Sequence, residues 1–153
     1  MKANNKLVIG YAYVCCDILN IGHLKHLRSC KSLCDKLIVG VLTDSAICER
    51  KVRPILSFGE RLETVQSIKF VDTAIKQETY SPLPNVFQLQ PDILFESTSH
   101  REEDFIKARE EVAKYGGKVL ILPYFDGQSS SHIKNKILKT WKYKEGEEND
   151  QEK

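Results

Sequence analysis

The chain has 153 residues, of which 41% are hydrophobic and 29% are charged. These fractions are typical of a globular protein and exclude a collagen-like, disulfide-dense or largely disordered chain. The length allows one hydrophobic core and is too short for two, so we expect a single domain. Lys and Arg number 23 against 21 Asp and Glu, and a net charge of +2 gives no overall attraction to nucleic acid or membranes.

Short apolar runs alternate with segments of helical periodicity along the chain. Strands are predicted at 7–14, 36–42, 73–75, 93–95 and 118–122, and helices at 22–34, 58–69, 85–89, 101–115 and 131–141. The run over 36–42 is continuously apolar, as in strands buried on both faces of a parallel sheet. The alternation predicts an α/β fold, a Rossmann-like parallel sheet of about five strands with helices on both faces, in a single domain.

The predicted domain spans residues 1–143, with Trp141 packing the last helix onto the core. From residue 144 the sequence KEGEENDQEK is polar and charged, so 144–153 are expected to be a disordered tail. Five cysteines, an odd number without a CxxC pair, favour reduced thiols and no zinc site. With no signal-like or membrane-spanning apolar stretch, we expect a cytoplasmic protein.

Ligands of parallel α/β sheets bind at the carboxyl ends of the strands. After the first predicted strand, the chain enters a helix through Cys15, Cys16, Asp17, Asn20, Gly22 and His23. A glycine turn into a helix exposes backbone N–H groups, and the helix N-terminus adds partial positive charge. The His23 ring and the Asn20 amide can donate hydrogen bonds to the same anion. This segment is therefore predicted to cradle phosphate.

A second helix start follows the last predicted strand. It combines a glycine turn with three hydroxyls, in Asp126, Gly127, Ser129, Ser130 and Ser131. Serines cap helices routinely, but both helix starts follow parallel strands and therefore lie at the same edge of the sheet. We expect them to bind one polyanion together.

Five segments, in order along the chain, resemble the nucleotidyltransferase superfamily with HxGH and ISSTxxI signatures, and specifically its cytidylyltransferase branch. DILNIGH (17–23) resembles D-[LI]-[LF]-H-x-G-H, and SSSHI (129–133) resembles STTxI. Between them, VGVLTD (39–44), KVRPILSFGER (51–61) and KFVD (69–72) resemble the strand ending in TD, the basic loop followed by ER, and RYVD. The resemblance covers residues 6–140.

This resemblance implies transfer of a nucleoside monophosphate from a triphosphate to a small phosphorylated acceptor, with release of pyrophosphate. The catalytic residues implied are His23, Asn20 and Lys51. The nucleotide-binding residues implied are Cys15, Cys16, Asp17, Gly22, Lys25, Asp126, Gly127, Ser129, Ser130 and Ser131. Arg53, Arg61 and His100 would bind the acceptor. Mg²⁺ is expected to arrive with the triphosphate and to need few protein ligands, and family members commonly form homodimers.

The chain departs from the family pattern at four places. Asn20 replaces the first motif His, Val14 replaces a Gly, and Tyr124 replaces the Arg of RTxGxS. The segment ESTSH (96–100) stands where the family often has GDDW. Asn can hydrogen-bond a phosphate but cannot carry positive charge, so charge stabilisation is expected to be redistributed or weakened.

Three substrate hypotheses follow. We prefer CTP with a small alcohol phosphate or phosphonate, because 41–47, 53–61 and 77–85 resemble cytidylyltransferases of phosphonate or phospho-alcohol metabolism. The alternative is an adenylyltransferase that uses ATP on a sugar phosphate, because YFDGQSSSHI (124–133) resembles the heptose-type enzymes, which also lack the Arg. A nucleotide-binding paralogue with weakened catalysis is the third, motivated by Asn20.

Overall fold

The computed structural model describes residues 6–151, with side chains described for residues 6–142. Its elements are β1 (Ile9–Val14), α1 (Ile21–Lys31), β2 (Lys36–Leu42), α2 (Asp44–Cys48), α3 (Phe58–Gln66), β3 (Thr73–Gln77), α4 (Leu83–Leu89), β4 (Ile93–Ser97), α5 (Glu102–Lys114), β5 (Lys118–Leu122) and α6 (Ser130–Gln151). All five predicted strands are present. The helix α2 was not predicted, because its five residues are too few to show helical periodicity.

The five strands form one parallel sheet in the order β3-β2-β1-β4-β5, which confirms the predicted α/β architecture. From β1 the chain moves outward through β2 to β3, then crosses to the other side of β1 to form β4 and β5. Backbone pairing between β1 and β4 ends at Tyr11 and Leu94. The carboxyl ends of β1 and β4 therefore lie where the winding direction reverses, which is where such sheets bind ligands.

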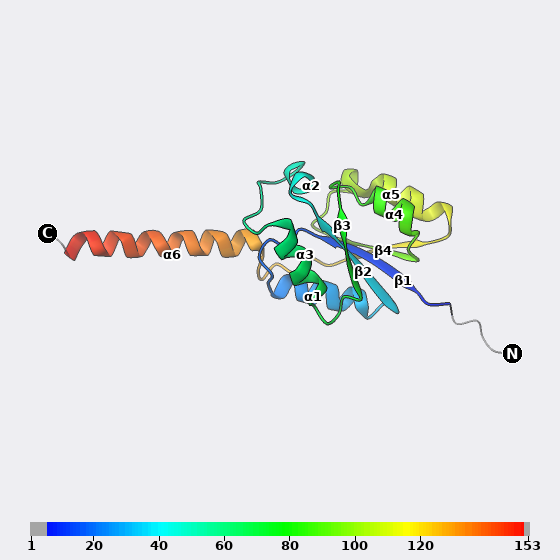
Figure 1. The fold of residues 1–153 in the computed structure, drawn as a ribbon, viewed down its shortest axis with the longest axis horizontal. Helices are drawn as coiled ribbons and strands as arrows, with labels where there is room; N and C mark the ends of the chain where they lie inside the picture. Colours follow the sequence, from blue (N-terminus) through cyan, green and yellow to red (C-terminus); the bar gives the residue numbers. More distant parts are fainter. Residues whose placement is uncertain (1–5, 152–153) are drawn as a thin grey trace.

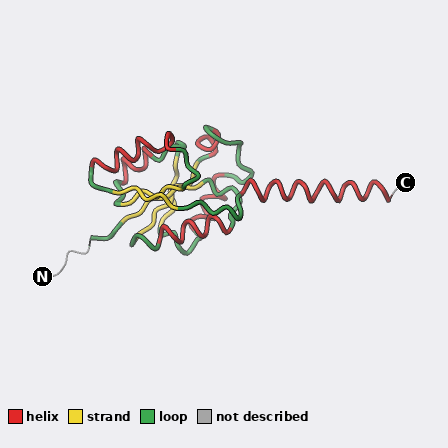
Figure 2. The backbone as a smooth tube through the Cα atoms, turned by 180° about the vertical axis from the view of Figure 1, so that it is seen from behind, coloured by secondary structure: helices red, strands yellow, loops and turns green. Residues whose placement is uncertain are grey.

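Helices cover both faces of the sheet (Figures 1 and 2), as predicted. On one face, Leu27 of α1 and Val65 of α3 pack with Val39 of the sheet in a fully buried core. On the other face, the buried core contains residues of α2, α4 and α5 together with strand residues such as Leu94. Burial on both faces explains why the central strands are continuously apolar.

The helix α6 projects away from the sheet as a long rod (Figures 1 and 2) and runs to Gln151. The helix was predicted to end at 141, whereas its backbone in the structure is helical to Gln151. The disordered tail at 144–153 stays a prediction. Trp141 is 66% exposed and does not pack onto the core as expected. Residues 152 and 153 lie outside the described residues, and the domain boundary at 143 stays a prediction.

Gly40 of β2 tests the packing of the sheet. A Cβ at Gly40 would collide with the Tyr11 hydroxyl and lie 2.8 Å from Gln77 Oε1. We expect Gly40→Ala to lower the free energy of unfolding by roughly 1–3 kcal/mol through overpacking, measured by urea denaturation. The control is Gly59→Ala in α3, where nothing lies within 4 Å of the new Cβ; a gain of up to about 1 kcal/mol is expected there from helix propensity. An unchanged midpoint for Gly40→Ala would contradict this packing.

Candidate active site

A cavity of about 310 Å³ opens at the carboxyl ends of the strands. Its walls come from the segments that follow β1, β2, β4 and β5 and from the first turns of α1 and α6. The predicted site residues that line it are Cys15, Asp17, Asn20, Gly22, His23, Lys51, His100, Ser129, Ser130 and Ser131. The two helix starts singled out in the sequence therefore meet at one cavity.

Asn20 is the N-cap residue of α1 and forms a capping box with His23. Its Oδ1 accepts a hydrogen bond from the Gly22 amide at 2.9 Å, and its Nδ2 donates to the Ile18 carbonyl at 2.9 Å. Asn is among the most favourable N-cap residues, so this position has a structural use for the side chain that replaces the family His. The second N–H of the Asn20 side-chain amide remains to donate to a ligand.

The ring of His23 is oriented by the same capping box. The backbone amide of Asn20 donates to His23 Nδ1 at 3.3 Å, which places the proton of the neutral ring on Nε2. Burial, and to a lesser degree Lys51, lower the pKa of His23 to about 4. At neutral pH the ring is therefore an uncharged hydrogen-bond donor in the wall of the cavity, rather than a cation.

The start of α6 is tied to the loop that follows β1. Ser130 Oγ donates to the Ile18 carbonyl at 3.0 Å and accepts from the Ile18 amide at 3.2 Å. Ser129 Oγ accepts from the His132 amide at 3.1 Å and so caps the helix. At Gly22 the two loops approach so closely that a Cβ would lie 2.8 Å from the Gln128 carbonyl oxygen. Only Gly allows this approach.

Asp17 links three segments around the cavity. Its Oδ1 accepts from the Ile55 and Leu56 amides at 2.8 and 2.9 Å, and its Oδ2 pairs with Lys134 of α6. Burial by itself raises the pKa of Asp17, but the hydrogen bonds from Lys134, Leu56 and Ile55 outweigh it and hold that pKa below its usual value. One carboxylate thus fixes the loop after β1, the basic loop and α6 relative to one another.

The basic loop contributes Lys51 to the cavity, but its arginines are placed differently. Arg53 lies 3.5 Å from Asp44 and does not line the cavity. Arg61 is fully buried, and its guanidinium donates to the carbonyls of Cys15 and Leu42 at 2.8 and 2.7 Å. Direct contact between Arg61 and an acceptor, as the sequence suggested, would require these bonds to break. In the structure Arg61 holds the carboxyl ends of β1 and β2 together.

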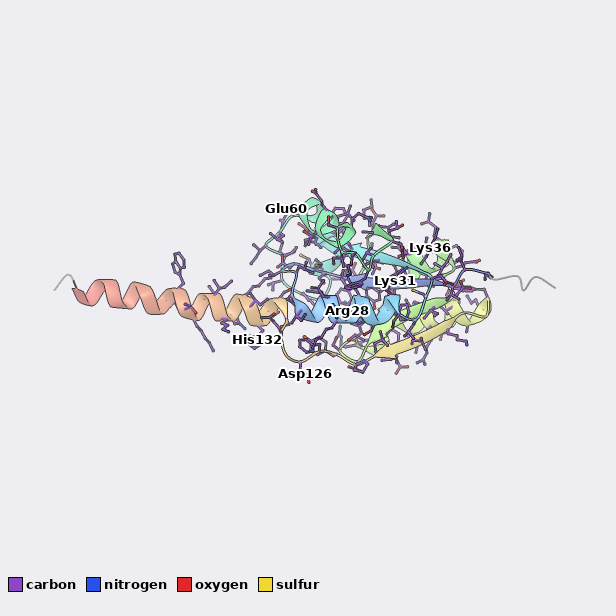
Figure 3. All side chains as sticks on the ribbon, turned by 90° about the horizontal axis from the view of Figure 1, so that it is seen from below. Arg28, Lys31, Lys36, Glu60, Asp126 and His132 are labelled. Atoms are coloured by element: carbon purple, nitrogen blue, oxygen red, sulfur yellow. The ribbon has the colours of Figure 1, made fainter. Side chains whose placement is uncertain are left out.

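Four other predicted nucleotide-binding residues lie outside the cavity wall. Cys16 is buried in the core with a φ of 51°, a left-handed conformation that turns the chain after β1. Lys25 Nζ lies 4.0 Å from the centre of the Phe125 ring, which does line the cavity. Asp126 and Gly127 are exposed on the loop before α6, with Asp126 at its outer edge (Figure 3).

A polar cluster that includes the predicted acceptor-binding residue His100 lies on the β4 side of the cavity. Its other members, Glu96 and Tyr13, were not among the predicted site residues. Glu96 is fully buried, accepts from the Tyr13 hydroxyl at 2.8 Å and contacts His100 Nδ1 at 2.5 Å. Burial raises the pKa of Glu96, although the hydrogen bonds from His100 and Tyr13 oppose this. Tyr13 and Tyr80 line the cavity as well. In the sequence, Tyr80 lies in segment 77–85 and Glu96 in segment 96–100, both compared with the family above, and Tyr13 lies just before the end of β1.

Side chains of metal-ligating types line this cavity, among them Asp17, His23 and His100. Within the described side chains, no group of three or more His, Cys, Asp or Glu residues is arranged to hold a metal ion. Asp17 and Asn20 already accept hydrogen bonds from the protein. Across residues 6–151, no helix combines the length and the apolar character that spanning a bilayer requires.

The fold and cavity define an α/β protein in which two helix N-termini meet at one cavity. Residues 12–136 match the family described as cytidylyltransferase-like. The chain belongs to this family of nucleotidyltransferases, which confirms the resemblance found in the sequence.

Relatives and solved structures agree with this assignment. The bifunctional protein HldE of Granulibacter bethesdensis is 35% identical over 133 residues, which are 86% of this chain and 27% of the relative. HldE of Geobacter sulfurreducens is 32% identical over 142 residues, 92% of this chain and 29% of the relative. The chain thus spans little more than a quarter of the length of these relatives.

Among solved structures, the lipopolysaccharide core biosynthesis protein from Thermoplasma volcanium GSS1 matches with a TM-score of 0.68 at 27% identity, over 80% of this chain and 100% of that chain. The pantoate-beta-alanine ligase from Francisella tularensis matches with a TM-score of 0.55 at 11% identity, over 85% of this chain and 63% of that one. The second likeness shows the fold alone.

Asp17 gives a prediction for the pH dependence of stability. Asp17→Asn should lower the free energy of unfolding at pH 7 by roughly 1–3 kcal/mol, because hydrogen bonds to a charged group are lost. The pKa of Asp17 is lowered by folding, so its contribution is present above the unfolded pKa of about 3.9 and is lost as the pH falls through the folded value.

The measurement is urea denaturation of both proteins at pH 7 and at decreasing pH below about 4. The difference in free energy of unfolding between wild type and Asp17→Asn should narrow as the pH falls. Asp126→Asn, at an exposed position on the loop before α6, is the control and should match wild type throughout. A gap that stays constant with pH would show that the Asp17 carboxylate is not the stabilising group.

Proposed function

We propose that the chain transfers AMP from ATP to a sugar phosphate and releases pyrophosphate. The observation that carries nucleotidyl transfer is the meeting of two helix N-termini at one cavity, in a chain that belongs to the cytidylyltransferase-like family. The choice of a sugar phosphate is supported by the solved relative named as a lipopolysaccharide core biosynthesis protein. The relatives named HldE and the heptose-type motif at 124–133 support the same choice.

The reaction requires positioning and charge relief more than covalent help from the protein. An acceptor phosphate oxygen attacks the α-phosphorus of the nucleotide, and the bond from that phosphorus to the oxygen of the β-phosphate breaks as pyrophosphate leaves with the electron pair. The triphosphate would lie across the first turns of α1 and α6, where helix dipoles attract negative charge. His23 Nε2 and the remaining N–H of Asn20 would donate to its oxygens.

Positive charge in this site would come from Lys51, because His23 is neutral at pH 7 and Asn20 carries none. Lys51 lines the cavity and belongs to the basic loop that Asp17 holds in place. We infer that it meets the acceptor phosphate as this approaches the α-phosphorus. Mg²⁺ carried by the triphosphate would neutralise part of the phosphate charge.

CTP with a small alcohol phosphate or phosphonate remains the second candidate. The observation that favours it is the similarity of segments 41–47, 53–61 and 77–85 to cytidylyltransferases of phosphonate or phospho-alcohol metabolism. Segment 77–85 contributes Tyr80 to the cavity wall.

The proposed setting is the cytoplasm, supported by the five free cysteines. The homodimer implied by the family resemblance stays a prediction.

The nucleotide is tested by pyrophosphate release, with Mg²⁺ and either ATP or CTP, against a panel of sugar phosphates, alcohol phosphates and phosphonates. We expect the highest kcat/KM for ATP with a sugar phosphate. A preference for CTP with an alcohol phosphate or phosphonate would favour the second candidate instead. Binding of either triphosphate in calorimetry without turnover of any acceptor would favour the paralogue with weakened catalysis.

The role of His23 is tested with the best substrate pair from that panel. We expect His23→Ala to reduce kcat by roughly 10²–10³-fold, the usual cost of removing one preorganised donor to a developing negative charge. His132→Ala is the matched control, because His132 is exposed on α6 outside the cavity (Figure 3) and should keep wild-type turnover. Turnover within threefold of wild type for His23→Ala would remove His23 from the catalytic residues.

A further inference from the structure

A second cavity adjoins the candidate active site. Its volume is about 610 Å³, and Lys51, Tyr80 and Ser99 line both cavities. Because the two cavities share these walls, a ligand whose phosphate lies beside Lys51 can extend from the first into the second. The transfer of a nucleoside monophosphate to a single phosphate leaves this second space without a role.

Two arginines from different segments of the chain line the second cavity. Arg50 follows α2, and Arg101 precedes α5. Both are held by the same carboxylate, since Arg50 Nε donates to Asp104 Oδ1 at 2.8 Å and Arg101 Nε donates to Asp104 Oδ2 at 3.2 Å. The Asp104 side chain is only 5% exposed. The two guanidinium groups are therefore fixed on a buried anchor rather than free to move.

Each guanidinium keeps donors for a ligand. Arg50 Nη1 donates to the Glu49 carbonyl at 3.1 Å, and Arg101 Nη1 pairs with Glu103 at 2.8 Å. In the described part of the chain, neither Nη2 has a hydrogen-bond partner. Planar guanidinium groups suit the recognition of carboxylate and phosphate.

The first turn of α5 borders the second cavity. Arg101 is the N-cap residue of this 13-residue helix and makes no side-chain capping bond. Arg101 and Asp104 both line the second cavity, so the helix begins at its wall. The first turn of α5 also carries Glu102, Glu103 and Asp104, whose carboxylates offset the partial positive charge of the helix N-terminus. The donors at this wall are therefore those of the two arginines.

We propose that the acceptor carries two anionic groups: the phosphate that attacks the nucleotide beside Lys51, and a second phosphate or carboxylate that Arg50 and Arg101 bind in the adjoining cavity. This inference rests on the proposed nucleotidyl transfer. It narrows the acceptor to a phosphorylated sugar with a further phosphate or a carboxylate. The second anion is bound without chemical change, so the bonds made and broken are those of the transfer itself.

The kinetic test uses pyrophosphate release with Mg²⁺-ATP and matched acceptors. For each sugar, three acceptors are compared: the 1-phosphate, the bisphosphate, and the 1-phosphate of the corresponding uronic acid. We expect the doubly anionic forms to have a KM at least tenfold lower, and the bisphosphate and carboxylate arms identify the second group. Arg50→Gln and Arg101→Gln should raise that KM about tenfold, leaving kcat and the KM of singly anionic acceptors within twofold.

The matched control is Arg109→Gln. Arg109 lies on the same helix α5 and pairs with Glu102 at 2.9 Å, but it lies outside the second cavity. Its variant should keep both KM values. If Arg50 and Arg101 only tie the loop after α2 to α5, their variants will change the KM of all acceptors alike or none, and the proposal is wrong.

A binding measurement separates this proposal from the proposed function. Cys48 is exposed and lines the second cavity, so its alkylation by iodoacetamide, followed by mass spectrometry, reports occupancy. A doubly anionic acceptor should slow Cys48 labelling at least fivefold in wild type and less than twofold in Arg101→Gln. Equal KM values for singly and doubly anionic acceptors overturn the proposal and leave nucleotidyl transfer standing. If no acceptor releases pyrophosphate, the proposed function fails. The rate of Cys48 labelling with and without the doubly anionic sugar phosphate then tests by itself whether the second cavity binds an anion.

Discussion

The attachment of α6 to the loop after β1 is the interaction on which the site depends. The helix projects away from the sheet (Figure 1), so its position relative to α1 is set at its first turn. There, Ser130 exchanges two hydrogen bonds with Ile18, and Lys134 pairs with Asp17. Asp17 also accepts hydrogen bonds from two backbone amides of the basic loop. A single carboxylate and a single hydroxyl thereby bring two positive helix ends and the loop that carries Lys51 to one cavity.

The substitution of Asn for the first motif His changes how the site handles charge. Asn20 caps α1 and orients His23 through the capping box, so helix formation and ring orientation depend on the same side chain. His23 is half-buried, and its lowered pKa leaves the ring uncharged at neutral pH. Stabilisation of phosphate charge then depends on hydrogen bonds, helix dipoles and Lys51 rather than on two imidazolium groups. This arrangement is suited to binding a polyanion that brings its own metal ion.

The local parts of the site could be predicted from the sequence because their signals are local. A glycine and a capping residue next to each other in the sequence identify the start of a helix. Because parallel strands have their carboxyl ends at one edge of the sheet, the helix starts that follow them are expected at that edge. Arg61 could not be placed in this way, since its burial depends on carbonyls of two strands that are distant in the sequence. The same is true of Glu96, whose partners are Tyr13 on another strand and His100 in the following turn.

The second cavity and the length of α6 could not be predicted from the sequence, for two further reasons. Arg50 and Arg101 are 51 positions apart in the numbering and are joined only by Asp104, so neither stands out as part of a pair. Beyond residue 141 the chain lacks the apolar periodicity from which a helix is predicted, so the extent of α6 to Gln151 could not be inferred from the sequence.

The most direct test of the shared cavity is an NMR titration of the labelled protein with Mg²⁺-ATP, following backbone amides at the two helix starts. The account predicts that Gly22 and His23 of α1 and Ser130 and Ser131 of α6 shift together and saturate with one Kd, because one triphosphate spans both. Shifts confined to one helix start, or two different Kd values, would contradict it.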